Sequence, residues 1–368
     1  MSKDQHQPLF EAGRIGELVT ENRFITSPMT RTSAEPDGVP SALMKEYYTA
    51  YAKGGFGLVI TEGTYTDLKS SQGYTNQPGI ATDRHVEGWK PIVDSVKSNG
   101  ARFIQQLLHA GALVQGNAHS DDIIAPSAIQ PQGEQLAHYG GQGPYNVPRE
   151  MTQADIAETV EAYANAARRS VDAGFDGVEI HGANGYLCDQ FMTDYTNQRT
   201  DEYGGPLDNR LRFSCDVVKA VVDAIGDQAV VGIRISQMKV NNFTHVWTGG
   251  AADANTIFRE ISAAGAHYIH VSTRNVEPVF DSDIPLAGFA KKYAGIVIAN
   301  GNMNDPDQAS EVLRDDHADF VAIARGALAD PSLPHKVAAE DAPIPFNPGM
   351  ITPVGTIQNT LDWKAANL

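Results

Sequence analysis

Short apolar runs alternate with longer amphipathic segments along most of the chain. The apolar runs are rich in Val and Ile, and most of them end at Gly, Pro or Asn, as buried strands do. They predict strands over Phe24–Pro28, Gly57–Glu62, Arg102–Leu108, Gly177–His181, Ala229–Ile235, His267–Ser272, Ile296–Asn300 and Phe320–Ala324. The amphipathic segments predict helices over Ser41–Lys53, Val86–Asn99, Gln153–Ala173, Asp208–Ile225, Asp253–Ala264 and Asp305–Arg314. Three of these helices have typical starting residues, at Ser41, Thr152 and Asp305-Pro306.

Strands that alternate with helices indicate parallel pairing through right-handed crossovers. Eight such units in about 300 residues favour a closed (β/α)8 TIM barrel, formed by residues 1–368 as a single domain. The alternative is an open, doubly wound sheet. The G-x-G-x-x-G motif, the strongest sequence sign of a dinucleotide-binding sheet of that kind, does not occur in the chain.

Two segments lie outside this alternation. Residues 112–149, between the third strand and the next helix, are polar and rich in Gly, Gln, Pro and Tyr. A loop of that length in a compact fold is usually a functional excursion, so we predict a lid there. The first twenty residues precede the first strand, and we expect them to cap the bottom of the barrel.

Composition limits the classes of function. The chain has a formal net charge of −17, which disfavours nucleic acids and anionic membranes as partners. It has no apolar run of about 18 residues, and its start, Met1–Gln5, lacks the apolar core of a signal peptide. The two cysteines, Cys188 and Cys215, are too few to hold an iron–sulfur cluster and are expected to be packing residues. These features favour a cytoplasmic protein.

The fourth predicted strand leads into a run of polar residues, "HGANGYLCDQFMTDYTNQRTDEYGG" at 181–205. In barrel enzymes the chemistry lies at the carboxyl ends of the strands. Alternation along the strand places Glu179 and His181 on its inner face. Asn184 and Tyr186 follow within five residues. We therefore predict that His181, Asn184 and Tyr186 reach one small volume above the barrel.

Other predicted strands carry polar residues near their ends. Gln105, Gln106 and His109 belong to the third strand and the residues after it, and Arg234 lies inside the apolar run "VVGIRIS". A charged side chain in such a run is almost never buried without a partner. Arg234 is therefore expected to meet an anionic group.

The loops after the seventh and eighth strands have the composition of a phosphate site. Barrels bind phosphate at these loops, where small residues let backbone N–H groups approach the oxygens and an arginine adds charge-assisted hydrogen bonds. The candidate residues are Gly301, Asn302, Arg325 and Gly326. A phosphorylated ligand is predicted.

These motifs together resemble the Old Yellow Enzyme family of FMN-dependent ene-reductases. The block at 181–205, continued by "NRLRF", is similar to that family's most specific signature. Further matches are "SPMTR" at 27–31, "QLLHAGA" at 106–112, "GIRIS" at 232–236, "NGNM" at 300–303 and "ARGALADPSLP" at 324–334. The resemblance extends over roughly residues 8–340.

The resemblance implies a place for each part of FMN. Pro28, Met29 and Thr30 would line the flavin, Gln106 would bind its pyrimidine edge, and Arg234 would stabilise the anionic reduced ring. Gly301, Asn302, Arg325 and Gly326 would hold the phosphate. The ring would then be the anionic partner that Arg234 requires.

The same resemblance implies the reaction. NADPH or NADH would dock transiently and reduce the flavin, which would pass hydride to an activated alkene such as an enone, maleimide or nitroalkene. His181 and Asn184 would bind the carbonyl oxygen, as the donors of an oxyanion hole do. Tyr186, a phenol with an ordinary pKa of about 10, would donate the proton. The enzyme would act as a monomer or homodimer.

Some positions depart from the family pattern. Leu108 stands where the family often has Trp, Ala112 where it often has Arg, and "SQMKVNNF" follows Arg234 in place of a turn that usually contains proline. Tyr139, Tyr145, Phe243 and Phe280 are equally consistent with substrate walls and with plain packing. Three other functions stay open: a related flavin dehydrogenase or demethylase, a flavin-free barrel aldolase or isomerase, and a binding protein without activity.

Overall fold

The computed structural model describes residues 5–368. Eight parallel strands form a closed barrel in chain order, because the last strand pairs with the first. The barrel strands are β3 (Phe24–Thr26), β4 (Leu58–Ile60), β6 (Arg102–Leu108), β9 (Gly177–Asn184), β10 (Val230–Lys239), β11 (Tyr268–Ser272), β12 (Val297–Asn300) and β13 (Phe320–Ile323). The predicted TIM barrel is confirmed.

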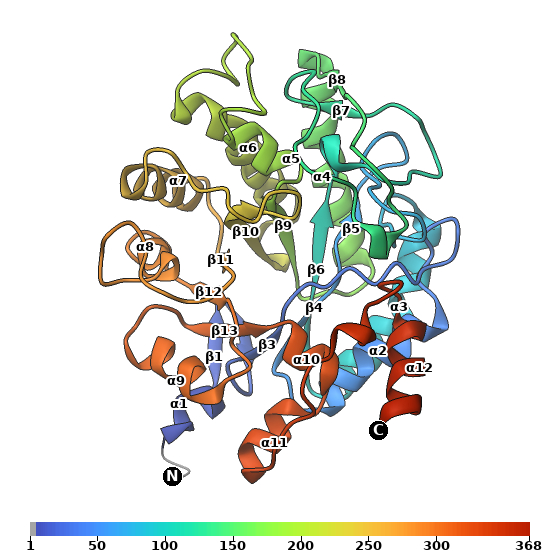
Figure 1. The fold of residues 1–368 in the computed structure, drawn as a ribbon, viewed down its shortest axis with the longest axis vertical. Helices are drawn as coiled ribbons and strands as arrows, with labels where there is room; N and C mark the ends of the chain where they lie inside the picture. The colour runs from blue at the N-terminus through green and yellow to red at the C-terminus, as the bar shows by residue number, and fades with distance from the viewer. Residues whose placement is uncertain (1–4) are drawn as a thin grey trace.

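The helices surround the strands (Figure 1). Those that follow the barrel strands are α2 (Ala42–Lys53), α3 (Asp83–Ser98), α4 (Gln153–Asp172), α6 (Leu207–Ile225), α7 (Ala251–Ala263), α8 (Leu286–Lys291), α9 (Pro306–Arg314), α10 (Arg325–Ala329) and α11 (Leu333–Ala339). The predicted starts are confirmed: Ser41 Oγ accepts the Met44 N–H, Thr152 forms a capping box, and Pro306 is the first residue of α9.

Shorter elements complete the chain. They are α1 (Gln7–Phe10), β1 (Gly13–Ile15), β2 (Leu18–Thr20), β5 (Thr64–Tyr65), β7 (Ile124–Ala125), β8 (Arg149–Glu150), α5 (Leu187–Met192) and α12 (Ile357–Asn367), with 3-10 turns at Gly111–Leu113, Ala137–Tyr139, Gly226–Gln228 and Pro348–Met350. No helix among the described residues is long and apolar enough to cross a bilayer.

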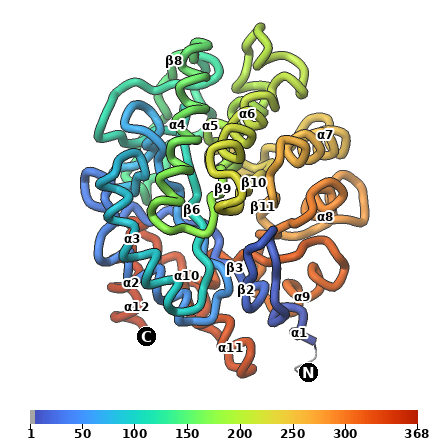
Figure 2. The backbone as a smooth tube through the Cα atoms, turned by 180° about the vertical axis from the view of Figure 1, so that it is seen from behind, coloured from blue at the N-terminus to red at the C-terminus, as the bar shows by residue number. Residues whose placement is uncertain are grey.

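The β1–β2 hairpin closes the bottom of the barrel. Ile15 and Leu18 are buried in one apolar cluster with Ile25, Ile104 and Phe320, which come from three barrel strands. Figure 2 shows the dark-blue N-terminal segment crossing in front of the strands at this end. The predicted cap is thus confirmed for the described part of the first twenty residues.

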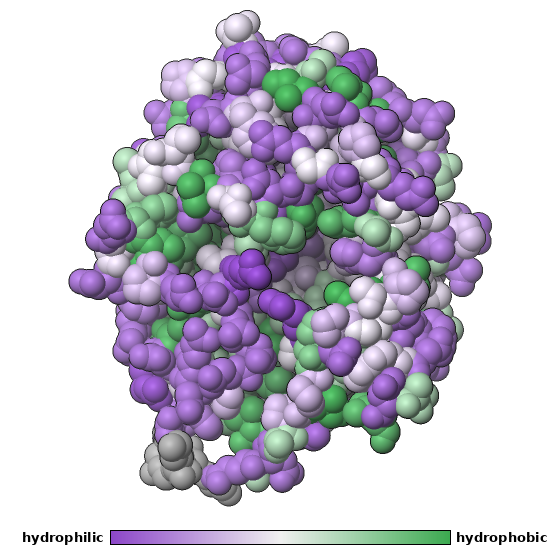
Figure 3. Space-filling view, in the orientation of Figure 1, coloured by the Kyte–Doolittle hydropathy of each residue, from purple (hydrophilic) through white to green (hydrophobic). Residues whose placement is uncertain are grey.

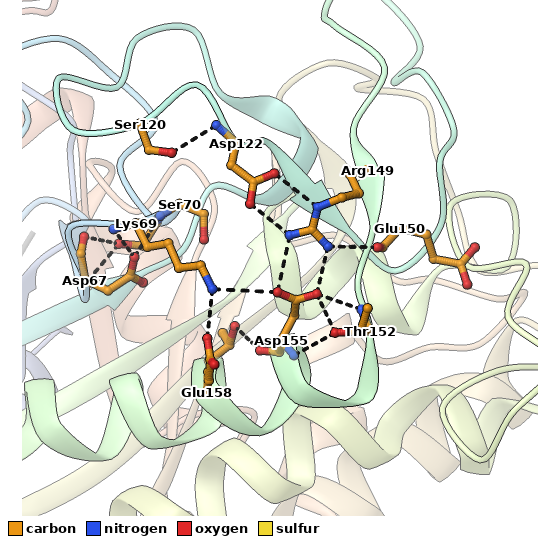
Figure 4. A network of polar contacts seen from close by, with 12 residues as sticks. Asp67, Lys69, Ser70, Ser120, Asp122, Arg149, Glu150, Thr152, Asp155 and Glu158 are labelled. Carbon is orange, nitrogen blue, oxygen red and sulfur yellow. Dashed lines mark hydrogen bonds and ion pairs between the residues drawn. The ribbon is translucent and has the colours of Figure 1, made fainter.

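Residues 112–149 form the predicted excursion, which is mostly irregular. Strand β7, inside the excursion, pairs with β8 at its end, and a polar network holds this base to the start of α4 (Figure 4). In that network Arg149 donates to both Asp122 and Asp155, and Lys69 adds ion pairs to Asp155 and Glu158. The excursion is therefore anchored at its base, while its middle extends toward the carboxyl ends of the strands.

Candidate active site

A cleft with two adjoining compartments opens at the carboxyl ends of the barrel strands. One compartment has a volume of about 460 Å³ and the other about 280 Å³. Pro28, Asn184 and Arg234 line both compartments, so the two are continuous. Figure 3 shows a central hollow on this face, bordered by hydrophilic side chains. We call the larger part the loop compartment, because residues after β11, β12 and β13 line it, and the smaller part the ring compartment.

Arg234 lies at the junction of the compartments. Its side chain projects inward from β10 and is 6% exposed. Its Nη2 donates to Ser27 Oγ and Ser272 Oγ, both at 3.1 Å, and to Asn300 Oδ1 at 3.0 Å. All three acceptors are neutral, its Nε has no partner, and no carboxylate of residues 5–368 lies within ion-pair distance. The protein therefore leaves a buried cation facing the cleft with no carboxylate in direct contact, although Glu179 in the layer below acts on it through space.

The loop compartment has the features of an anion site. Gly301 begins the loop after β12, where a Cβ atom would lie 2.4 Å from Thr273 Oγ1, so only glycine allows these two loops to approach. Asn302 follows with a positive φ of 57°. Arg325 and Arg274 also line the compartment, and neither guanidinium has a hydrogen bond or ion pair within the described chain. Both are free to bind a phosphate.

Three of the four predicted phosphate residues line this compartment, and Gly326 does not. It lies in the first turn of α10, where a Cβ atom would meet Asn304 Cβ at 2.6 Å. Its small size thus serves the packing of α10 against the neighbouring loop. Arg274, which follows β11, was not predicted, because an arginine in a polar loop has no distinguishing signal in the sequence.

Gln106 faces the ring compartment with a defined orientation. Its Nε2 donates to Glu179 Oε1 at 2.8 Å. Glu179 also accepts from Tyr268 Oη at 3.2 Å and pairs with His270 Nδ1 at 2.9 Å. Burial opposes the ionisation of Glu179, but His270 and Arg234 keep the pKa of its carboxyl below the usual value. Because an ionised carboxylate accepts only, Gln106 must give it the NH₂ group, which leaves the amide oxygen for a ligand.

His181 is a neutral donor toward the ring compartment. Its Nδ1 accepts the Ala183 N–H at 3.3 Å, so the ring proton of the neutral form lies on Nε2. Burial lowers the pKa of His181 well below its usual value, and the charges of Arg234 and His270 lower it further. The side chain lines the ring compartment. It can therefore offer an N–H without becoming charged.

Asn184 stands beside it in a left-handed conformation, with φ 62°. Its N–H donates to Ser236 Oγ at 2.8 Å, and its C=O accepts the Val240 N–H at 3.0 Å. Both partners belong to the segment that follows Arg234. The turn lets the side chain line both compartments.

Tyr186 completes the polar group in the ring compartment. Its ring packs edge-on against His181 with centroids 4.8 Å apart, and its hydroxyl lies 2.6 Å from that of Tyr74. Burial raises the pKa of Tyr186 above that of a free phenol, so the hydroxyl is protonated at neutral pH. The sequence does not predict Tyr74, because it lies in the loop after β5, outside the motifs described above.

Pro28, Met29 and Thr30 form one wall of the ring compartment, as predicted. The excursion covers them, because the Tyr139 hydroxyl donates to Thr30 O at 3.1 Å. Residues of the C-terminal segment, among them Phe346 and Ile351, line the same compartment. The lid prediction is thus supported by contacts, and Tyr139 is one of its covering residues.

Other candidate residues lie elsewhere. His109 is buried against Ser70 and the Gly111 N–H and lines neither compartment. Gln105 points outward to Ser170 on α4. Phe243 lines both compartments, whereas Tyr145 and Phe280 line neither. Among the described residues no group of His, Cys, Asp or Glu is arranged to hold a metal ion.

Comparison with known proteins identifies the family. A model of the NADH:flavin oxidoreductase / NADH oxidase family matches residues 8–342. The chain belongs to this family. Old Yellow Enzyme gives the family its other name, and a solved Old Yellow Enzyme homologue from Zymomonas mobilis superposes with a TM-score of 0.83 at 30% identity, covering 96% of this chain and 99% of the other.

Relatives within the family bear names of reductases. A putative 12-oxophytodienoate reductase 6 from rice is 39% identical over 93% of this chain and 88% of its own length. A probable flavin mononucleotide-dependent alkene reductase from Leishmania infantum is 36% identical over 90% of each chain. The structure of morphinone reductase in complex with tetrahydroNAD has a TM-score of 0.84 at 33% identity, covering 95% and 96% of the two chains. The protein is thus a flavin oxidoreductase of the Old Yellow Enzyme family.

The residues of the cleft fit a flavin. Arg234 is a buried cation that no carboxylate contacts, Gln106 presents an amide oxygen as acceptor, and Arg325 is a free cation in a loop compartment of small residues. The flavin ring, anionic when reduced, would pair with Arg234, and a ring N–H would donate to Gln106. The phosphate would bind Arg325.

Proposed function

We propose that the cleft binds FMN and that the protein reduces activated alkenes, with NADH or NADPH as the electron donor. The observation that carries the proposal is the convergence of two neutral donors and a protonated phenol, His181, Asn184 and Tyr186, on the compartment beside Arg234. The relatives named as an alkene reductase, a 12-oxophytodienoate reductase and a morphinone reductase support the same chemistry.

The charges and polar groups of the two compartments support FMN as the ligand. Pro28, Met29, Thr30, Gln106 and Arg234 would hold the ring, and Gly301, Asn302 and Arg325 would hold the phosphate. Arg274 lines the same end and adds a second cation there. Bound FMN would supply the redox chemistry, accepting two electrons from NAD(P)H and returning them as hydride to the alkene.

His181 and Asn184 would bind the substrate through its carbonyl oxygen or other electron-withdrawing group. Negative charge develops on that oxygen when hydride reaches the β-carbon. Donors that are already in place stabilise this charge without reorganisation. The neutral state of His181 suits this role, because its Nε2–H donates at any pH above the depressed pKa of the ring.

Tyr186 would supply the proton to the α-carbon. Its phenol is protonated at neutral pH, as a general acid must be. When Tyr186 gives up its proton, Tyr74 can donate a hydrogen bond to the phenolate oxygen from 2.6 Å away. The lid, with Tyr139 over Thr30, would keep bulk water from the site.

The test is a half-reaction experiment on the purified protein. We expect denaturation to release FMN, NADH or NADPH to bleach the flavin anaerobically, and 2-cyclohexenone or a maleimide to restore its absorbance. His181→Ala should slow the second step by on the order of a hundredfold, because one oxyanion donor is removed. Released FAD, or a colourless protein that does not take up FMN, would refute the cofactor. A reducible flavin that no activated alkene reoxidises would refute the substrate class.

A further inference from the structure

A buried ion pair lies directly behind the turn that carries Asn184. Lys239 Nζ is 2.7 Å from Asp189 Oδ1, and the two side chains are 2% and 0% exposed. Lys239 also donates to Thr193 Oγ1 at 2.7 Å. Lysine is almost never fully buried unless it is paired. Lys239 belongs to "SQMKVNNF", the segment where the sequence departs from the family pattern.

The ion pair acts on the turn through Asp189. The other carboxylate oxygen of Asp189 accepts the Gly185 N–H at 2.6 Å. Asn184 and the following residue, Gly185, both have positive φ values, of 62° and 89° respectively. A left-handed non-glycine residue costs on the order of 1 kcal/mol and persists only where its surroundings hold it. The carboxylate is one of the groups that hold this turn.

The backbone of Lys239 acts on the same turn. After an irregularity at Ile235, strand β10 pairs with β9 again, with Lys239 opposite Asn184. The next N–H, of Val240, donates to Asn184 O, and Ser236 Oγ accepts the Asn184 N–H. The end of β10 therefore fixes both backbone groups of Asn184, and the Lys239 side chain neutralises the carboxylate that fixes the following residue.

We propose that Lys239 is a positioning residue for substrate binding. Its ammonium keeps the Asp189 carboxylate on the Gly185 N–H, and this holds Asn184 in the conformation that points its side-chain amide into the cleft. The inference rests on the proposed function, because it takes Asn184 as a ligand donor. Lys239 also lines the loop compartment, but its ammonium is turned to Asp189 and Thr193, so its effect on the substrate passes through Asn184.

The first experiment measures the clamp without any ligand. In flavin-free protein, hydrogen exchange of the Gly185 N–H should be at least tenfold faster in Lys239→Met than in wild type. Thr193→Val, which removes one hydroxyl from the network, should have a smaller effect in the same direction and serves if Lys239→Met does not fold. The matched control is Lys291→Met. Lys291 pairs with Asp319 at 2.7 Å, and Asp319 accepts the Val297 N–H at the start of β12. Lys291→Met therefore removes a lysine from a similar lysine–aspartate–backbone contact, but at the amino end of a barrel strand, away from the cleft.

The second experiment measures ligand binding in the FMN-loaded protein. Absorbance titration gives the Kd of a para-substituted phenol, which mimics an enolate oxygen, for wild type, Lys239→Met, Asn184→Ala and the double variant. Lys239→Met should weaken phenol binding about tenfold in the wild-type background and less than twofold when Asn184 is already Ala. Lys291→Met should not change the Kd.

The outcomes separate this inference from the proposed function. Equal losses from Lys239→Met in both backgrounds, or an unchanged Gly185 exchange rate, would overturn the role of Lys239 and leave the proposed function standing. An Asn184→Ala variant that binds phenol as tightly as wild type would overturn both, because Asn184 would then not be a donor.

Discussion

Glu179 and Arg234 are both buried charges inside the barrel, on paired strands one residue layer apart, yet their surroundings differ. Glu179 accepts hydrogen bonds from Gln106, Tyr268 and His270, so the chain itself satisfies its charge. Arg234 meets only two hydroxyls and an amide oxygen. The lower layer is therefore a structural support, and the upper layer leaves the Nε of Arg234 without a partner until a ligand binds. A buried charge marks a binding site when its partners are all neutral.

The largest expected effect is on the rate of alkene reduction, and it should come from Tyr186, which lies in the cleft near Arg234. Tyr186→Phe keeps the ring and removes only the hydroxyl. Reoxidation of the reduced flavin by 2-cyclohexenone should slow by roughly 10²–10⁴, the usual contribution of a positioned general acid. Flavin reduction by NAD(P)H should stay within a few-fold of wild type, because it needs no proton from this phenol.

Stopped-flow absorbance measures both steps of the Tyr186→Phe variant. Reoxidation by oxygen is the internal control, since it needs no protonation of carbon and should change little. Enone reoxidation at the wild-type rate would assign the proton to water or to another side chain.

Replacing Glu179 and replacing Arg234 should change the free energy of unfolding by different amounts. Glu179→Gln leaves three buried donors competing for one acceptor oxygen, and should lower the free energy of unfolding of the flavin-free protein by about 3 kcal/mol. Arg234→Met should change that quantity by less than about 1 kcal/mol, because it removes a buried charge that no carboxylate contacts. Urea denaturation of both variants checks this. Equal losses would mean that the Arg234 layer is as structural as the Glu179 layer.

Glu62 is another buried acidic group, and its hydrogen bonds only partly offset the cost of burying its charge. It accepts the N–H groups of Arg31 and Thr32, next to Thr30, at 2.8 and 3.1 Å. Burial raises the pKa of its carboxyl to about 7 from an ordinary 4.5, against the effect of these hydrogen bonds. The folded state therefore holds the Glu62 proton over a pH range in which the unfolded state has lost it.

The sign of the pH effect follows from this difference. Folded protein binds more protons between pH 4.5 and 7, so the contribution of Glu62 to the free energy of unfolding falls as pH rises through that window. The total change is on the order of 3 kcal/mol. The difference in unfolding free energy between wild type and Glu62→Gln, measured from pH 4 to 8, should follow this fall. A difference that does not vary with pH would show that the carboxyl titrates normally.

Much of the fold could be predicted because each barrel strand is a short apolar run between turn residues. Arg102–Leu108 was predicted to the residue, and the other strands to within a few residues. The largest error was at β10, which extends from the predicted end at Ile235 to Lys239. The extension forms because β10 pairs with β9 again after an irregularity in register. The polar residues after Ile235 do not predict this pairing.

The candidate site could be predicted where a residue follows a strand and could not where a loop brings it in. His181 was predicted from strand alternation, Asn184 from its place just after the apolar strand, and Arg234 as a charge inside an apolar run, and all three lie in the cleft. Tyr74 comes from a loop whose path the sequence does not determine, and Arg274, although it follows β11, has no distinguishing signal in a polar loop. Lys239 was missed for a different reason: lysine is normally exposed, and only its burial beside Asp189 shows its place behind the site.

The most direct test of the account is the binding of FMN and riboflavin to flavin-free protein, followed by quenching of flavin fluorescence. The oxidised ring is neutral and would meet Arg234 through a charge-assisted hydrogen bond, so Arg234→Met should weaken both ligands by the same factor, roughly 10- to 150-fold, since such a contact contributes about 1.5–3 kcal/mol and riboflavin keeps the ring. Arg325→Ala should weaken FMN and spare riboflavin, which has no phosphate. If Arg234→Met binds both flavins as tightly as wild type, the charge of Arg234 does not await the flavin, and the central claim fails.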